Sequence, residues 1–160
     1  MWAGGEVVFH PGWGDKLVLD GRPWSCDERI GEVVLRNDKV FVDVWRRYGL
    51  GHGDPGARPR WDIEERRTLV FLKSAVAPST RLIRHGHRDL LVHGPLTLAL
   101  MLDALPPVAS ISYRNYAPLY VNERLRVCVR RPERPRKPWD VWVEGPDGGL
   151  AVKATAEVLS

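Results

Sequence analysis

The sequence predicts an α+β fold in which a curved antiparallel sheet wraps one central, buried helix. The chain contains 15 Gly and 13 Pro among 160 residues, which favours short strands joined by turns over a bundle of helices. One segment alone, residues 95–105, has the pattern of a helix, and strand-like segments lie on both sides of it. Hydrophobic residues make up 44% of the chain, as in ordinary globular proteins, which excludes wholesale disorder.

Five short stretches before residue 73 fit strands. They are rich in apolar, β-branched and aromatic residues and are bounded by turn residues, and they cover residues 7–9, 16–19, 30–35, 40–45 and 68–72. The polar turn 36–39 joins the third stretch to the fourth and predicts a hairpin. Residues 49–59 hold four Gly and two Pro, so they predict a loop.

Residues 96–105 are apolar on almost every side of a helix, which predicts a helix enclosed by the rest of the protein. Pro95 suits the first helical position, where a missing N–H group costs nothing, and Pro106 and Pro107 end the helix. No apolar run in the chain reaches the about 18–20 residues of a membrane span.

Strand patterns return after the helix. They cover residues 111–116 with a continuation at 119–121, then 125–129, 139–143 and 150–159, and Gly145–Gly149 is a hairpin turn. A brief strand at residues 80–83 is also compatible with the pattern. Five strands, one buried helix and four strands are typical of a hotdog fold, in which the sheet wraps the helix.

Charge and cysteine content narrow the classes of function. Two cysteines, Cys26 and Cys128, provide neither a disulfide framework nor a metal cluster and fit a reducing compartment. The net charge of +4 is small and spread along the chain, so a phosphate-bearing small ligand fits as well as nucleic acid. No glycine-rich phosphate loop precedes a helix, and we expect neither a cofactor nor a metal. No targeting segment is recognisable in the sequence.

The histidines are the clearest chemical feature. His85, His87 and His93 lie within nine residues, beside Asp89 and just before the predicted helix. A histidine with a nearby carboxylate is common equipment for general acid–base chemistry at neutral pH. The helix start at Gly94 offers backbone N–H groups that could polarise a thioester carbonyl. The alternative is a solvated polar loop in which His93 caps the helix, and a zinc site is weaker because further ligands are lacking.

A basic run follows at residues 130–138, with five positive charges among three prolines. Such a run forms neither a helix nor a central strand, so a solvated hairpin loop is one interpretation. The functional interpretation is a contact of Arg131, Arg134, Arg136 and Lys137 with the phosphates of coenzyme A or of a phosphopantetheine carrier. Nucleic acid fits less well, because no aromatic residues are interleaved with these charges.

Several segments resemble one known family. The stretches LLVHGPLTLALML (90–102), SYRNYAPLYVNERLRVCVRR (112–131) and WDVWVEGPDGGLAVKATAEV (139–158) resemble the fungal and mitochondrial type 2 hydroxyacyl-thioester dehydratases. These belong to the MaoC-like hotdog group, with mesaconyl-CoA hydratase as a close relative. MWAGGEVVF (1–9) and ERRTLVF (65–71) resemble the N-terminal hotdog unit of the same family.

The chain departs from this family in two places. Family members carry more sequence before the WAGG strand, including the helix of the first unit. They also carry a catalytic segment between stretches that resemble residues 80–84 and 86–96 here, and this segment is missing. The resemblance therefore implies residues 1–73 as a remnant N-terminal unit without its helix, and residues 74–160 as a C-terminal unit with its central helix at 95–105.

The resemblance implies dehydration of (R)-3-hydroxyacyl thioesters, or the reverse hydration, by a protein impaired through the missing segment. In that role we expect His85, His87 and Asp89 as acid–base groups and His93 with Gly94 as the oxyanion site. Two alternatives stay open: a non-catalytic hotdog domain that binds acyl thioesters or a protein partner, and a hotdog recruited to another reaction in secondary metabolism. The expected partner is an acyl-CoA or acyl-carrier-protein thioester, with no nucleic acid or membrane. We also expect a homodimer or an intramolecular hotdog pair, in mitochondria by resemblance or otherwise in the cytoplasm.

Overall fold

The computed structural model describes residues 2–51, 61–72, 89–134 and 137–159. Eight strands and two helices occur in these ranges. In chain order they are β1 (Trp2–Phe9), α1 (Trp13–Lys16), β2 (Trp24–Arg36), β3 (Lys39–Leu50), β4 (Ile63–Leu72), α2 (Gly94–Asp103), β5 (Val108–Asn115), β6 (Arg126–Arg130), β7 (Trp139–Glu144) and β8 (Leu150–Val158).

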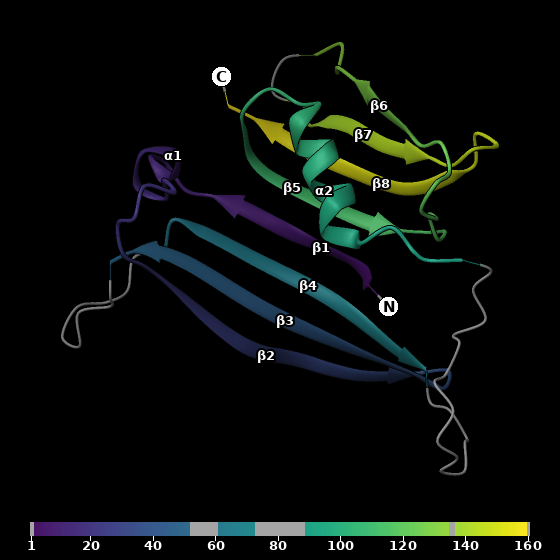
Figure 1. The fold of residues 1–160 in the computed structure, drawn as a ribbon, viewed down its shortest axis with the longest axis horizontal. Coiled ribbons are helices and arrows are strands. Elements are labelled where there is room, and N and C mark those ends of the chain that lie inside the picture. The colour runs from purple at the N-terminus through teal and green to yellow at the C-terminus, as the bar shows by residue number, and fades with distance from the viewer. Residues whose placement is uncertain (1, 52–60, 73–88, 135–136, 160) are drawn as a thin grey trace.

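All eight strands form one antiparallel sheet in the order β2-β3-β4-β1-β5-β8-β7-β6. β1 lies in the middle and pairs with β4 on one side and with β5 on the other. It therefore joins the strands that precede α2 to those that follow it (Figure 1). The predicted fold class, an antiparallel sheet with a helix packed against it, is confirmed.

The predicted hairpin turns are also confirmed. Asn37 and Asp38 connect β2 to β3 with positive φ angles of 45° and 59°, a conformation that Asn and Asp tolerate better than most residues. Gly148 has a φ of 75° in the turn between β7 and β8, where glycine carries no steric penalty. These turns set the register of the strands on either side.

The core lies between α2 and the C-terminal half of the sheet. Leu98 and Met101 on α2 are buried with Ile111 of β5 and with Val141 and Val143 of β7. Alternate residues of each strand point to one face, so the apolar set of these strands meets the helix as one layer.

Helix α2 differs from its prediction in both bounds and burial. It begins at Gly94 and ends at Asp103, rather than covering 95–105. It is not enclosed, because Leu96 keeps 53% of its surface exposed and Ala99 is exposed as well. A sheet covers it on one side only, and among the described residues no second layer lies over its outer side (Figure 1).

The predicted strand at 16–19 is wrong. Residues Trp13–Lys16 form a short helix instead, and the Lys16 ammonium donates a hydrogen bond of 2.6 Å to the buried carboxylate of Asp62. The same carboxylate accepts the Leu50 backbone N–H at 3.3 Å. A charge pair therefore ties the end of this short helix to a residue distant in sequence.

The predicted continuation at 119–121 is reduced to a single bridge between Leu91 and Tyr120. The predicted loop at 49–59 begins later than expected, since Gly49 and Leu50 still belong to β3, and residues 52–60 lie outside the described residues. The possible strand at 80–83 lies outside them too. Four strands, rather than five, precede α2 among the residues described.

No helix within the described residues is long and apolar enough to cross a membrane.

The core contact between α2 and the sheet predicts a large loss of stability for Met101→Ala. Met101 is fully buried, so the truncation leaves a cavity and should lower the free energy of unfolding by about 2–5 kcal/mol. Urea unfolding followed by circular dichroism measures the change. Leu19→Ala is the control, because Leu19 is 96% exposed and the change should stay within about 0.5 kcal/mol. Equal effects of both substitutions would contradict this account of the core.

Candidate active site at the start of helix α2

The segment before α2 is held in place by backbone hydrogen bonds. The Val92 N–H donates to the Leu119 carbonyl at 2.8 Å, and the Val121 N–H donates to the Leu90 carbonyl at 2.9 Å. His93 is then the N-cap residue, and its carbonyl accepts the Leu96 N–H at 2.9 Å. The start of the helix is therefore fixed to the chain that follows β5.

Gly94 opens α2 and lies directly against the indole ring of Trp2 from β1. A Cβ atom at position 94 would come within 2.1 Å of Cε3 of this ring, which is far inside a van der Waals contact. Only glycine fits here without a shift of one element. Pro95 follows without an N–H group, and the Gly94 N–H lies in the first turn of the helix, where backbone donors have no acceptor within the helix and the helix dipole favours negative charge.

Three contacts orient Trp2. Its indole N–H donates to the Gly4 carbonyl at 2.9 Å, and the Asn115 side-chain amide donates to the Trp2 carbonyl at 2.8 Å. The ring meets Tyr113 edge to face, with centroids 5.7 Å apart. Both Asn115 and Tyr113 belong to β5, the strand next to β1, so the neighbouring strand locks the indole in position.

An ion pair with a buried carboxylate lies beside the Trp2 ring. Arg67 donates to both carboxylate oxygens of Glu65, at 2.5 and 2.8 Å, and its guanidinium lies 5.0 Å from the centroid of the Trp2 ring. Glu65 is 5% exposed. A buried carboxylate costs free energy unless it is paired and hydrogen-bonded, and the two-pronged contact meets that condition.

The Tyr113 hydroxyl is buried and has no hydrogen-bond partner among the described residues. Gly5 makes room for it, since a Cβ atom at position 5 would lie 2.8 Å from the hydroxyl oxygen. Burial, and secondarily the negative charge of Glu65, raise the pKa of Tyr113 well above its ordinary value. The hydroxyl therefore keeps its proton at neutral pH and can act only as a neutral donor or acceptor.

These contacts bring together residues from four of the sequence motifs. Trp2 comes from WAGG, Glu65 and Arg67 from ERRTLVF, Gly94 from VHGPL, and Tyr113 from SYRNYAPLY. The cluster can present a backbone N–H to a carbonyl oxygen beside a fixed aromatic wall. Among the described residues no group of three or more His, Cys, Asp or Glu is placed to hold a metal ion.

Only some of the predicted acid–base residues lie within the described residues. His85 and His87 lie outside the described residues. Asp89 is exposed, and its carboxylate accepts the N–H of the next residue, Leu90, at 2.7 Å. His93 is exposed and makes no side-chain capping bond, although its backbone occupies the N-cap position. Asp89, His93 and Gly94 thus lie in one short stretch, and the acid–base role remains a prediction.

The predicted phosphate contacts lie in the connection between β6 and β7. Arg131, Arg134 and Lys137 are exposed, whereas Arg136 lies outside the described residues. The Arg131 guanidinium lies 5.9 Å from the centroid of the Trp139 ring. In Figure 1 this connection is near the C-terminal end of α2, away from Gly94, so a ligand touching both would have to extend along the helix.

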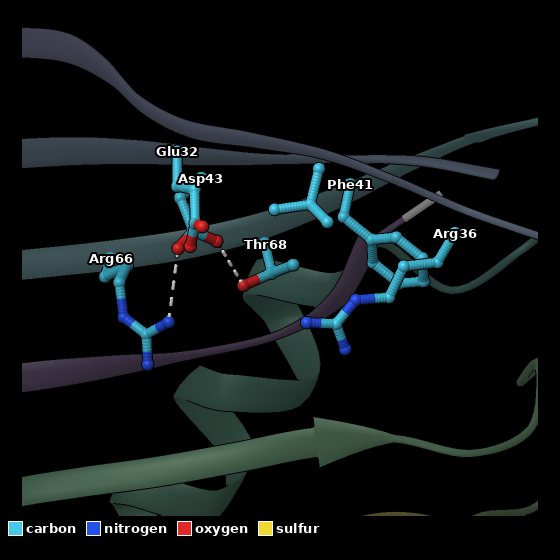
Figure 2. Close-up of a pocket in the computed structure, with 7 residues that line it drawn as sticks. Glu32, Arg36, Phe41, Asp43, Arg66 and Thr68 are labelled. Carbon is cyan, nitrogen blue, oxygen red and sulfur yellow. Dashed lines mark hydrogen bonds and ion pairs between the residues drawn. The ribbon is translucent and has the colours of Figure 1, made fainter.

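A separate hollow of about 250 Å³ opens on the face of the sheet opposite α2. Figure 2 shows its side chains, which come from β2, β3 and β4. Asp43 accepts hydrogen bonds from Thr68 at 2.6 Å and from Arg66 at 3.3 Å. Since these polar groups satisfy one another, we assign no chemistry to this hollow.

Comparisons with known proteins agree with the motifs. No family model matches the chain. The chain is 35% identical over 78 residues to mesaconyl-C(4)-CoA hydratase of Chloroflexus aurantiacus, and this alignment takes in 46% of the chain and 27% of the relative. HtdX of Mycobacterium tuberculosis has a similar structure, with a TM-score of 0.69 at 15% identity over 99% of this chain and 75% of that protein. The resemblance to the MaoC-like hotdog group is confirmed.

Two further solved structures share the fold of this chain. A MaoC-like dehydratase of Phytophthora capsici has a TM-score of 0.67 at 10% identity, over 99% of this chain and 72% of that one. An acyl-ACP thioesterase of Bacteroides thetaiotaomicron has a TM-score of 0.64 at 10% identity, over 98% and 75%. The chain spans about a quarter of the curated hydratase, so the activity of that whole protein is carried over only as a proposal.

The sequence interpretation missed Glu65, Arg67 and Tyr113 as members of this cluster. They were present in the quoted motifs, but nothing in their spacing shows that they meet, because β4 and β5 touch only through β1. Gly4 and Gly5, which follow shortly after Trp2, were the signal in the sequence that could have indicated a close contact at this strand. Adjacent glycines inside a strand indicate that another group comes close to the backbone.

The contact between Gly94 and Trp2 predicts that Gly94→Ala destabilises the protein. The new methyl group would overlap the indole, and such overpacking costs about 1–3 kcal/mol of unfolding free energy. Gly149→Ala is the matched control, since no heavy atom lies within 4 Å of a Cβ at that position. Thermal and urea unfolding of both variants measure the difference. An unchanged stability of Gly94→Ala would show that Trp2 does not hold the helix start.

The burial of Tyr113 predicts a loss of stability at alkaline pH. An unfolded tyrosine ionises near pH 10, whereas the folded state keeps the proton because the pKa of Tyr113 is raised. The stabilisation from this group is therefore complete below pH about 10 and is lost as the pH rises above it, by about 1.4 kcal/mol per pH unit. Urea unfolding at pH about 9 and about 11 should show a smaller decrease for Tyr113→Phe than for the native chain. Identical pH slopes would mean that the hydroxyl is not buried.

Proposed function

We propose that this chain acts on acyl thioesters, adding water to a 2-enoyl thioester or removing it from an (R)-3-hydroxyacyl thioester. The observation that carries the proposal is the convergence of four motif segments on the start of α2, around the contact of Gly94 with Trp2. The sequence similarity to a hydratase of a CoA ester and the MaoC-like dehydratase among the structural neighbours support it.

The chemistry needs three elements. Dehydration removes a proton from C2 and hydroxide from C3, so a base must take the first proton and an acid must protonate the leaving oxygen. The charge that develops on the thioester oxygen needs a donor, and the Gly94 N–H at the positive end of α2 supplies one. We assign the acid–base roles to His85, His87 and Asp89, with the His93 backbone fixing the helix start.

The carrier group of the substrate is coenzyme A or an acyl carrier protein. Arg131, Arg134, Arg136 and Lys137, which follow β6 and precede β7 in the sequence, are the residues we assign to its phosphates. We do not propose nucleic acid as a ligand of these residues, because the basic run lacks interleaved aromatic residues. On the basis of the resemblance we further propose that the protein is of the fungal type of this family and forms a homodimer. By the same resemblance we propose a location in mitochondria or otherwise in the cytoplasm.

One observation favours a second candidate, a non-catalytic domain that binds acyl thioesters. The Asp89 carboxylate is exposed and already accepts the N–H of its own neighbour, Leu90. Such a carboxylate is poorly placed to hold a histidine or to abstract a proton from a buried substrate. Under this alternative the start of α2 binds the thioester and no water is transferred.

Hydration of crotonyl-CoA, followed by loss of the enoyl absorbance, separates the two candidates. We expect turnover by the native chain and a loss of at least about tenfold in kcat for Asp89→Asn and for each of His85→Ala and His87→Ala, because general acid–base groups contribute about 10²–10⁴-fold. Asp147→Asn is the control, since Asp147 lies exposed in the β7–β8 turn. Binding without turnover would favour the non-catalytic candidate, and full activity of the three variants would overturn the assigned roles.

A further inference from the structure

The orientation of the Trp2 indole sets the position of the helix start. A Cβ atom at position 94 would lie 2.1, 2.8 and 2.9 Å from Cε3, Cζ3 and Cδ2 of this ring, so the backbone of Gly94 rests on that part of the indole. These three atoms lie off the Cβ–Cγ bond of the tryptophan. A rotation of the indole about this bond therefore moves them into Gly94 or away from it.

The indole is held from three strands. The hydrogen bond to the Gly4 carbonyl holds its N–H group within β1, and the ring of Tyr113 meets it from β5 at an interplanar angle of 76°. The contact from β4 is the Arg67 guanidinium, which lies over the ring, 5.0 Å from its centroid. A cation over the face of a tryptophan is attracted by the quadrupole of the ring, so Arg67 favours one orientation of the indole.

The guanidinium is itself immobilised. Glu65 accepts hydrogen bonds from two of its nitrogen atoms, Nε and Nη2, at 2.5 and 2.8 Å. The side chain of Glu65 is 7% exposed and that of Arg67 is 22% exposed. A two-pronged contact fixes the plane of a guanidinium, which a single contact to a lysine ammonium does not. The cation is thus placed before any ligand binds.

Stability alone does not account for an ion pair with a buried carboxylate at this position. The cost of removing the charges from water is close to the gain from their attraction, and apolar residues of similar size often serve as well. A fixed position for the guanidinium is what the pair adds beyond such a replacement. The group that gains from this fixed position is the indole, and through the indole the start of α2.

We propose that Arg67 is a positioning residue of the thioester site, which fixes the Trp2 indole and thereby holds the Gly94 N–H against the carbonyl oxygen of the bound thioester. The inference rests on the proposed function, because that function assigns the Gly94 N–H to this oxygen. Arg67 acts through Trp2 and makes no contact with the substrate. A donor stabilises developing charge only when it is aimed at the oxygen, and a misplacement of about 1 Å can cost about 10²-fold in rate.

Two variants remove the guanidinium without leaving a buried charge unpaired. Arg67→Lys keeps a positive charge beside Glu65 but lacks the planar fork. The double variant Glu65→Met with Arg67→Met removes both charges, so the chain should still fold. Arg66→Met is the matched control, because Arg66 is the next residue along β4, points to the opposite face of the sheet and also forms an ion pair, with Asp43 at 3.3 Å. Far-UV circular dichroism checks the fold of all three proteins.

Nuclear magnetic resonance of the full chain without ligand tests the first step. The ring current of Trp2 should displace the α-proton resonances of Gly94 from ordinary glycine values. We expect this displacement to decrease in both Arg67 variants and to stay unchanged in Arg66→Met. A purely structural role of Arg67 would lower the unfolding free energy but leave the Gly94 resonances of the folded protein in place.

The second step is tested with butyryl-CoA carrying carbon-13 at its carbonyl, a saturated thioester that has no double bond to hydrate. A hydrogen bond to this carbonyl shifts its resonance, and we expect a smaller shift on both Arg67 variants than on the native chain. In the hydration of crotonyl-CoA we expect kcat to fall at least about tenfold while KM stays within about threefold, because the misplaced donor acts mainly in the transition state.

The proposed function and the positioning role fail in different ways. A native chain that does not bind butyryl-CoA would overturn the proposed function, and the Gly94 resonances would still decide whether Arg67 positions the helix start. Binding without hydration leaves the decision to the carbonyl resonance. The positioning role is wrong if the Gly94 resonances are unchanged in both Arg67 variants, or if Arg66→Met shifts them equally. A rise in KM at unchanged kcat would also overturn it, because Arg67 would then bind the ligand directly.

Discussion

The indole of Trp2 lies against the backbone of Gly94 with no room for a side chain between them. Most other features of the candidate site depend on this contact. Trp2 opens the central strand β1, and Gly94 opens the helix that covers half of the sheet. The contact therefore fixes where α2 begins relative to both halves of the sheet, and it places the first backbone N–H group of the helix.

The surroundings of Trp2 show how a polar cluster is kept inside a sheet protein. The Glu65 carboxylate is buried with both oxygens bound by Arg67, and the Arg67 guanidinium also lies on the indole face. Loss of the arginine would leave a buried, unpaired charge, which costs far more than the net value of the pair. Both partners belong to β4, so the pair satisfies the buried charge within that strand, and its link to β1 is the contact of the Arg67 guanidinium with the Trp2 ring.

The sequence predicted much of the fold and only part of the site. The alternation of apolar residues identified β5, β6 and β7, and the turn at Asn37–Asp38 was predicted from its polar residues, which tolerate positive φ. The helix start was visible from Pro95. The role of Glu65, Arg67 and Tyr113 was not, because these residues reach Trp2 from strands on opposite sides of β1, and spacing along the chain carries no information about that.

By itself the sequence determined the class of fold, the positions of its turns and the approximate extent of α2. Those features follow from local preferences, such as the alternation of apolar residues and the restrictions of proline and glycine. Only the tertiary structure decided the strand order, the short helix at Trp13–Lys16 and the exposure of one side of α2. These depend on partners distant in sequence: Asp62 for Lys16, and for α2 a sheet that covers one side and leaves the other open.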